Sequence, residues 1–199
     1  MQGGYLTLGR IKGIPIRAHW TVPIGMLMFS GGRLEPALWL GVLLVIVLHE
    51  LGHAFIVNRV GLVNAGIDLT GFGGMCRWMG QPTRVQRAMV AWGGVWAQLV
   101  LLAIALPIRL VLGWTGIPIV DGLLRCFTEI NGIMILFNLI PFGPLDGREA
   151  WPLFRYLWED RRRRQKYRRA AKGDPLDSPG AQTLREALRD AERNKDRPS

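Results

Sequence analysis

Cysteine and histidine are scarce in this sequence, with two cysteines and three histidines among 199 residues. Cys76 and Cys126 lie far apart and form no Cys-x-x-Cys pair. This spacing excludes a thiolate zinc site and gives no sign of a disulfide framework. We therefore expect both cysteines to be reduced, and any metal chemistry must come from other residue types.

Polar residues are too few before position 141 to cover the surface of a soluble domain. Apolar residues gather there in four long runs, whereas charged residues gather after position 154. A run of about 20 apolar residues can cross a bilayer as a helix. The pattern therefore predicts a membrane protein with a hydrophilic tail. The first twenty residues also lack an apolar stretch followed by a small-residue cleavage site, so we expect no cleaved signal peptide.

The formal net charge is +10, which by itself could indicate a nucleic-acid-binding protein. Much of this charge, however, lies in the basic run at residues 161–169, just beyond the last apolar segment. A basic run in that place is typical of a topology anchor at the membrane surface. We therefore expect membrane lipid as a partner and no nucleic acid.

Four segments could cross the membrane, and they predict an all-α multi-pass membrane protein with about four transmembrane helices. The first contains Pro15 and Pro23, so it could instead be tilted or lie at the interface. The second and third are long enough for a hydrocarbon core of about 30 Å. The segments are residues 14–30, 36–57, 87–112 and 118–140.

The predicted domain organisation is a membrane domain over residues 1–159 followed by a basic, hydrophilic tail over residues 160–199. Between the second and third spans, residues 58–86 are rich in glycine and contain short apolar pieces, which predicts a loop with short strands. Arginines and lysines collect on the side of this loop and of both termini if there are four spans. The positive-inside rule then places the loop and both termini in the cytoplasm, with the protein in the cell (inner) membrane.

The second span carries the most informative residues, His49-Glu50-Leu51-Gly52-His53. On a helix, histidines four residues apart lie on one face and can reach a single ion, with the intervening glutamate beside it as a general base. Two histidines and a carboxylate are also costly in an apolar helix, so they need a compensating role. The alternative is that they hydrogen-bond neighbouring helices and only hold the bundle together. His19, beside Trp20 near a span end, is left out of the site.

A catalytic zinc ion needs a third protein ligand and an open position for water. Asp146 is the best candidate, because Pro141 and Pro144 break the fourth helix just before it. Broken backbone at membrane depth is tolerated where it is buried or lines a cavity. The competing interpretation makes Asp146 a helix N-cap with Glu149 as its capping-box partner, and without the histidines this would be favoured.

These residues together resemble the site-2 proteases, a family of intramembrane zinc metalloproteases. In that family the histidine motif is completed by the aspartate of an Asn-x-x-Pro-x-x-Pro-x-Asp-Gly segment on a later helix. The matching residues here are Asn138, Pro141, Pro144, Asp146 and Gly147. The similarity runs from residue 13 to about residue 158, and the chain resembles a compact member without extra peptide-binding or nucleotide-sensing domains.

The resemblance implies Zn²⁺ bound by His49, His53 and Asp146, with Glu50 as the catalytic base. It also implies a substrate-binding role for Asn138 and for Gly73 and Gly74, which look like the Gly-Gly turn of the family. The alternative for Asn138 is a buried amide that bonds backbone groups freed by the prolines. The expected substrate is a single-span membrane protein, cut in or near its membrane segment. The sequence gives no indication of an oligomeric state.

One part of the family pattern is not kept. The family carries Gly-Pro-x-x-Asn on the helix between the two metal motifs, and this chain has Val95 and Gln98 at the proline and asparagine positions. The longer side chain of glutamine moves the amide group, and valine removes the proline constraint. A membrane scaffold that keeps the fold but does not cleave therefore remains the alternative function, although the intact Glu50 argues against it.

Overall fold

The computed structural model describes residues 3–172, 180 and 183–189. It divides into two compact units, Met1–Leu153 and Phe154–Ser199, which are described separately. The first unit carries every candidate site residue. In the second, α7 (Pro152–Lys172), which begins just before the boundary, is a helix rich in arginine, and residues 183–189 are also helical. Our division at residue 160 stays a proposal.

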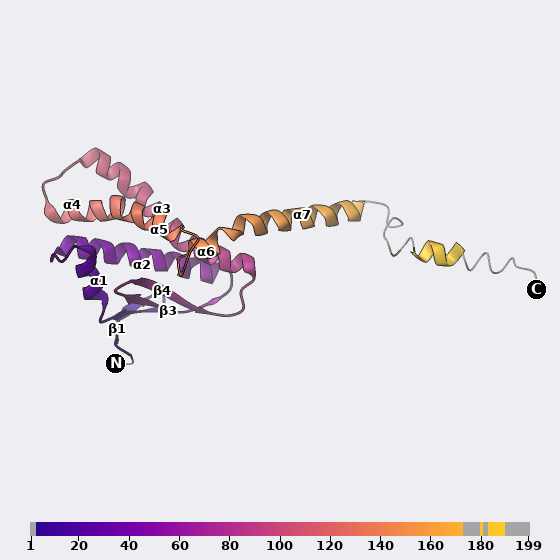
Figure 1. Ribbon diagram of the computed structural model, residues 1–199, viewed down its shortest axis with the longest axis horizontal. Coiled ribbons are helices and arrows are strands. Elements are labelled where there is room, and N and C mark those ends of the chain that lie inside the picture. The colour runs from indigo at the N-terminus through magenta and orange to yellow at the C-terminus, as the bar shows by residue number, and fades with distance from the viewer. Residues whose placement is uncertain (1–2, 173–179, 181–182, 190–199) are drawn as a thin grey trace, which may run out of the picture. The chain divides into compact units, whose positions relative to one another are not determined.

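A four-stranded sheet forms one layer of the first unit (Figure 1). Its strands are β1 (Tyr5–Ile11), β2 (Ile14–His19), β3 (Val63–Thr70) and β4 (Gly73–Met79), in that spatial order. The β2–β3 pair is parallel and the other two pairs are antiparallel. The expected short strands in the glycine-rich loop are therefore present as β3 and β4. The all-α prediction is wrong in this respect, because the fold is mostly helical with a sheet.

The segment predicted as the first membrane helix, residues 14–30, is not one helix. It forms β2 and then the short helix α1 (Val22–Phe29). In β2 the side chains alternate, with Ile14 and Ile16 buried in the core between more exposed neighbours. This two-residue period suits a strand packed on one face. At about 1.5 Å per residue, α1 is only about 12 Å long.

Two helices among the described residues are long and apolar enough to cross a membrane: α2 (Pro36–Arg59) and α3 (Arg84–Leu112). Proline starts α2, and a capping box between Thr83 and Gln86 starts α3. The second and third predicted spans are therefore helices of membrane-crossing length and composition.

The fourth predicted span is helical but interrupted. It consists of α4 (Pro118–Arg125), a π-helical turn η1 (Cys126–Ile130) and α5 (Asn131–Asn138). The helix then ends before Pro141, and the chain turns through residues 139–146 into the short helix α6 (Gly147–Ala150). A broken fourth helix was expected from the prolines, and the structure has it.

Helix α2 lies at the centre of this unit. Figure 1 shows the sheet on one side of α2, and α3 with the α4 to α5 segment on the other. The buried face of α2 packs against Ile67 and Leu69 of β3 and Cys126 of η1. The sheet covers one side of α2 and the other helices cover the opposite side. The residues of the histidine motif are therefore buried: His49, Glu50 and His53.

Candidate metal centre

Helix α2 carries both histidines of the motif on one face. Their Nε2 atoms lie 3.0 Å apart, and the rings meet edge to face. This follows from the four-residue spacing, which places successive side chains one turn apart on a helix. Ligand atoms of His49, Glu50 and His53 all lie within 4.8 Å of one another. Among the described residues, the motif thus forms a compact group of metal-binding side chains.

Asp146, in the turn just before α6, joins this group. Its Oδ2 atom lies 3.0 Å from His49 Nε2 and 3.2 Å from His53 Nε2. The residue does stand at the N-cap position of α6, but its side chain makes no capping hydrogen bond. Its carboxylate is therefore directed at the histidines and away from the helix end, and the N-cap interpretation loses its main contact.

The three converging atoms have the spacing of a zinc site. Tetrahedral zinc with bonds of about 2.0–2.1 Å holds its ligand atoms roughly 3.3 Å apart. The separations between His49 Nε2, His53 Nε2 and Asp146 Oδ2 are 3.0 to 3.2 Å. Asp146 Oδ2 is also buried and has no hydrogen-bond partner among the described residues. A buried carboxylate oxygen without such a partner is costly, and a cation between the three atoms would satisfy it.

Glu50 lies beside the histidines and is covered by β4. The carboxylate is so close to the backbone of Gly74 that a Cβ atom there would lie 2.5 Å from Oε1 and 2.7 Å from Cδ. Only glycine leaves room for the carboxylate at this point. Gly74 therefore shapes the wall next to Glu50, whereas a Cβ atom on Gly73 would meet no heavy atom within 4 Å.

Helix α3 orients both imidazole rings. His53 Nδ1 lies 2.7 Å from the backbone oxygen of Val90, and His49 Nδ1 lies 3.0 Å from Gln98 Oε1. Between these contacts, Gly94 approaches the rings so closely that a Cβ atom would lie 2.6 Å from His49 Nδ1 and His53 Nε2. When Nδ1 of each ring donates its proton to these oxygens, Nε2 is left with a lone pair for a metal.

Asn138 lies next to Gln98. Its amide nitrogen is 3.3 Å from Gln98 Oε1 and 3.5 Å from His49 Nδ1. The contacts are with side chains, so they do not match the alternative that Asn138 bonds backbone freed by the prolines. They also place Asn138 beside Nδ1 of His49, whereas Nε2 of the same ring faces Asp146.

The positions of Val90 and Gln98 were not identified as site residues from the sequence. Gln98 stood out only because it departs from a family pattern, and nothing in the sequence showed which residues of α3 would face the histidines. The Val90 contact is made by a backbone oxygen, for which a sequence holds no signal. His19 bonds Thr21 and lies outside the metal group, as expected.

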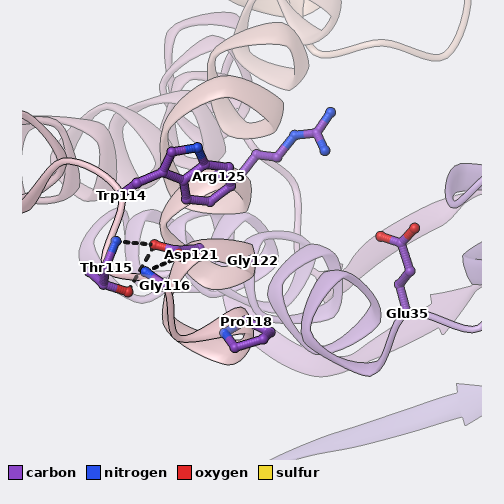
Figure 2. Close-up of a pocket in the computed structure, with 8 residues that line it drawn as sticks. All are labelled: Glu35, Trp114, Thr115, Gly116, Pro118, Asp121, Gly122 and Arg125. Atoms are coloured by element: carbon purple, nitrogen blue, oxygen red, sulfur yellow. Dashed lines mark hydrogen bonds between the residues drawn. The ribbon is translucent and has the colours of Figure 1, made fainter.

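A cavity of about 740 Å³ lies elsewhere, near the N-terminal end of α2. Figure 2 shows Asp121 directed at the backbone of Thr115 and Gly116, and its carboxylate accepts bonds of 2.9 to 3.0 Å from these two residues. Asp121 therefore holds the loop before α4. The cavity does not coincide with the metal group. Its lining residues are Glu35, Trp114, Thr115, Gly116, Pro118, Asp121, Gly122 and Arg125.

Comparison with known proteins connects this site to zinc metalloproteases. No protein-family model matches the chain. The chain is 29% identical over 173 residues to Rip3 of Mycobacterium tuberculosis, which is named as a zinc metalloprotease, covering 77% of this chain and 44% of Rip3. It is also 29% identical over 150 residues to a zinc metalloprotease of Methanocaldococcus jannaschii, covering 71% and 43% of the two chains. The chain thus spans less than half the length of these curated relatives.

The solved structures support the same relationship at the level of the fold. The site-2 protease of Methanocaldococcus jannaschii superimposes with a TM-score of 0.59 at 23% identity, over 75% of this chain and 71% of that one. The chain is therefore related in sequence to zinc metalloproteases and has the fold of a site-2 protease. The resemblance seen in the sequence motifs is confirmed.

Proposed function

We propose that this relative of the site-2 proteases is an intramembrane zinc metalloprotease that hydrolyses a peptide bond in or near a membrane-spanning segment of its substrate. The observation that carries the proposal is the convergence of His49 Nε2, His53 Nε2 and Asp146 Oδ2 within 3.2 Å of one another, beside the buried Glu50. This arrangement supplies three ligands and a base, which is the set that a hydrolytic zinc site requires.

In this proposal His49, His53 and Asp146 hold the metal. Zinc bound there would act as a Lewis acid that activates a water molecule and polarises the scissile carbonyl. The two rings stay fixed because Val90 and Gln98 accept hydrogen bonds from their other nitrogens. Fixed ligands matter because catalysis depends on the position of the reacting groups within fractions of an ångström.

Glu50 is the proton carrier. Its carboxylate accepts a proton from the attacking water and then donates it to the nitrogen of the departing amine. The backbone of Gly74 packs directly against the Glu50 carboxylate, because Gly74 has no side chain in between. This contact keeps the carboxylate next to the histidines. Burial of Glu50 among α2 and β4 also keeps bulk water away from the reacting bond.

The substrate in this proposal is a single-span membrane protein that unwinds locally, because a helix hides its own peptide bonds. Strand β4 is at the edge of the sheet and runs past Glu50, so its free edge offers backbone groups for an extended peptide. Gly73 and Gly74 belong to this strand. The non-helical turn at residues 139–146 lies beside the site and supplies a second stretch of backbone that the substrate can contact. Asn138, next to this turn, is the third residue to which this proposal gives a substrate-binding role.

For localisation we propose a multi-pass protein of the cell membrane with the metal site near the cytoplasmic side and both termini in the cytoplasm. The supporting observation is the position of the motif toward the C-terminal end of α2, close to Arg59. Basic residues at that end favour the cytoplasmic side.

The proposal is tested by the exchange Glu50→Gln, which keeps size and polarity but removes the base. Zinc content of the detergent-purified protein should stay near one ion per chain, while cleavage of a co-expressed single-span substrate should stop. Glu129→Gln is the matched control, because Glu129 is an exposed carboxylate whose ion pair among the described residues is with Arg125, one turn earlier in the same helical segment. It should cleave like the unmodified chain.

The same experiment separates the protease from the non-cleaving scaffold. A scaffold needs the fold but no base, so its binding of a membrane partner should survive Glu50→Gln and no cleavage should occur in either protein. Cleavage that continues unchanged in Glu50→Gln would contradict the proposed mechanism. Absence of zinc from the unmodified chain would contradict the metal site.

A further inference from the structure

Gln98 of α3 makes the most unusual contact near the metal group. Its side chain is fully buried, with an exposed fraction of 0%. The other buried residues of α3 are all glycine, alanine or valine. The Oε1 atom of Gln98 lies 3.0 Å from His49 Nδ1 and 3.3 Å from Asn138 Nδ2. A buried amide is costly unless it is bonded, so these contacts need a role.

These atoms, as placed, are consistent with one arrangement of donors and acceptors. Asn138 Nδ2 carries only protons, so the atom of Gln98 that faces it must be the oxygen. The same oxygen faces His49 Nδ1, which must then be the protonated nitrogen of that ring. His49 Nε2 is left with its lone pair and points at His53 Nε2 and Asp146 Oδ2.

Residues of the fourth helical segment hold Gln98 in this position. Asn138 donates to its side-chain oxygen, and Asn131, about two turns earlier on the same segment, donates from Nδ2 to the backbone oxygen of Gln98 at 2.9 Å. Asn131 is itself fully buried. The glutamine is therefore fastened at its backbone and at its side chain, and its amide cannot rotate freely.

We propose that Gln98 is a positioning residue, which fixes the tautomer and orientation of His49 for metal binding and is itself held by Asn138. This inference rests on the metal site of the proposed function. It assigns a role to Gln98, which stands where the family pattern has asparagine. The side chain of glutamine is longer than that of asparagine, and its carbonyl reaches from α3 to the His49 ring. Partners of this kind raise metal affinity because they fix the ligand in its binding form.

The test compares zinc affinity in detergent, by competition with a chelator, for three variants. Gln98→Met keeps the length and fills the same space but has no acceptor, so affinity should fall on the order of 10- to 100-fold. Gln98→Glu keeps an acceptor toward His49, so it should bind zinc at least as tightly as the unmodified chain. Val95→Ala is the control, because Val95 is equally buried on α3 but its aliphatic side chain cannot hydrogen-bond the rings. It should retain zinc affinity.

A second measurement reports on His49 directly. The chain has three histidines, so ¹⁵N-labelled imidazole signals can be assigned by replacing His19 and His53 in turn. The unmodified chain should show His49 protonated at Nδ1, with and without zinc. Gln98→Met should shift His49 of the zinc-free protein toward the tautomer protonated at Nε2, because Nδ1 then loses its acceptor while Nε2 still faces Asp146 Oδ2 at 3.0 Å.

The outcomes separate this inference from the proposed function. Unchanged zinc affinity and an unchanged His49 tautomer in Gln98→Met would overturn the role of Gln98 and leave the metal site intact. An equal loss of affinity in Val95→Ala would also overturn it, since α3 packing would then be the cause. If the unmodified chain binds no zinc, the proposed function fails, and the tautomer of the zinc-free protein still decides whether Gln98 positions His49.

Discussion

At the scale of single residues, Asp146 has contacts that decide between two roles. It stands where a helix cap would stand, but its carboxylate lies within 3.2 Å of both histidine Nε2 atoms and makes no capping bond. The contacts therefore favour the ligand role, and the two roles predict different effects of one substitution.

Replacing Asp146 by asparagine should leave stability nearly unchanged but abolish the metal site. Asparagine is about as good at an N-cap as aspartate, yet it supplies no anionic oxygen to zinc. We expect zinc affinity and turnover to fall by orders of magnitude, with a change in thermal midpoint of at most a few degrees. Chelator competition, a cleavage assay and thermal unfolding in detergent measure the three quantities.

Asp160→Asn serves as the control for this prediction. Asp160 is an exposed carboxylate that pairs with Arg164 within α7, so its loss should alter neither zinc binding nor cleavage. Full cleavage by Asp146→Asn would show that the third ligand has been assigned to the wrong residue.

At the scale of elements, the contact between α2 and α3 depends on a glycine. Gly94 faces both imidazole rings, and a methyl group there would collide with atoms of His49 and His53. Gly132 in α5 is the opposite case, because a Cβ atom there would meet no heavy atom within 4 Å. The two glycines therefore form a matched pair for one substitution.

Gly94→Ala should displace the rings and reduce zinc affinity at least tenfold, the range seen when the support of a metal ligand is lost. Gly132→Ala should keep zinc affinity and stabilise α5 by roughly 0.5–1 kcal/mol, because alanine favours a helix over glycine. Zinc affinity and thermal unfolding of both variants provide the comparison. Equal zinc affinity in the two variants would show that α3 does not approach the rings as closely as described here.

The sheet is joined by a charged cluster on the face opposite α2. Asp68 of β3 accepts a paired hydrogen bond of 2.7 and 2.8 Å from Arg17 of β2, and Arg77 of β4 lies 2.8 Å away. Burial by itself would raise the pKa of the Asp68 carboxyl, but Arg17 and Arg77 outweigh it and hold the pKa below its usual value. One carboxylate thus connects three strands.

The lowered pKa of Asp68 gives a pH dependence of defined sign. The contribution of the cluster to stability is complete above the unfolded-state pKa of about 3.9, and it is lost as the pH falls through the lower folded-state value. Asp68→Asn should therefore destabilise the protein by roughly 2 kcal/mol at pH 7 and equally at pH 5. Below about pH 4 the difference from the unmodified chain should narrow.

Thermal unfolding in detergent at several pH values measures this difference. Arg10→Gln is a suitable control, because Arg10 lies on the exposed strand β1 outside the cluster. A difference that grows as the pH falls below 4 would mean that the sign assigned to Asp68 is wrong.

At the scale of the whole membrane unit, the sheet constrains how the chain crosses the bilayer. The parallel pairing of β2 with β3 places residues 16–18 beside residues 67–69. Helix α2 lies between them in the chain and is long and apolar enough to cross the bilayer once. We propose that it does so and that residues 20–35 lead the chain back across, with α1 covering only about 12 Å of a core of about 30 Å.

This geometry predicts that Arg33 and Arg59 lie on opposite sides of the membrane. A cysteine introduced at Arg33 in a chain lacking Cys76 and Cys126 should react with a membrane-impermeant reagent from outside the cell. A cysteine at Arg59 should react only after lysis, and a reporter fused after Ser199 should read cytoplasmic. The same labelling pattern at both positions would mean that residues 20–35 do not cross.

The sequence alone identified a group of residues that could hold a metal ion. His49, Glu50 and His53 were identified because the helical period places them on one face, and the long apolar runs identified α2 and α3 because apolar surface of that length needs lipid around it. The prolines after Asn138 predicted the break in the fourth segment. The histidine spacing, the apolar runs and the prolines are local properties. They depend only on residues close together in the sequence and not on the fold of the rest of the chain.

Only the tertiary structure decided the rest. Residues 14–30 are apolar enough for a helix, and their pairing with β3, far along the chain, makes the first half a strand. The choice between cap and ligand for Asp146 depends on which groups face it, and the contact of Gln98 with His49 depends on where α3 crosses α2 at Gly94. Such contacts join residues distant in sequence, so no local pattern specifies them.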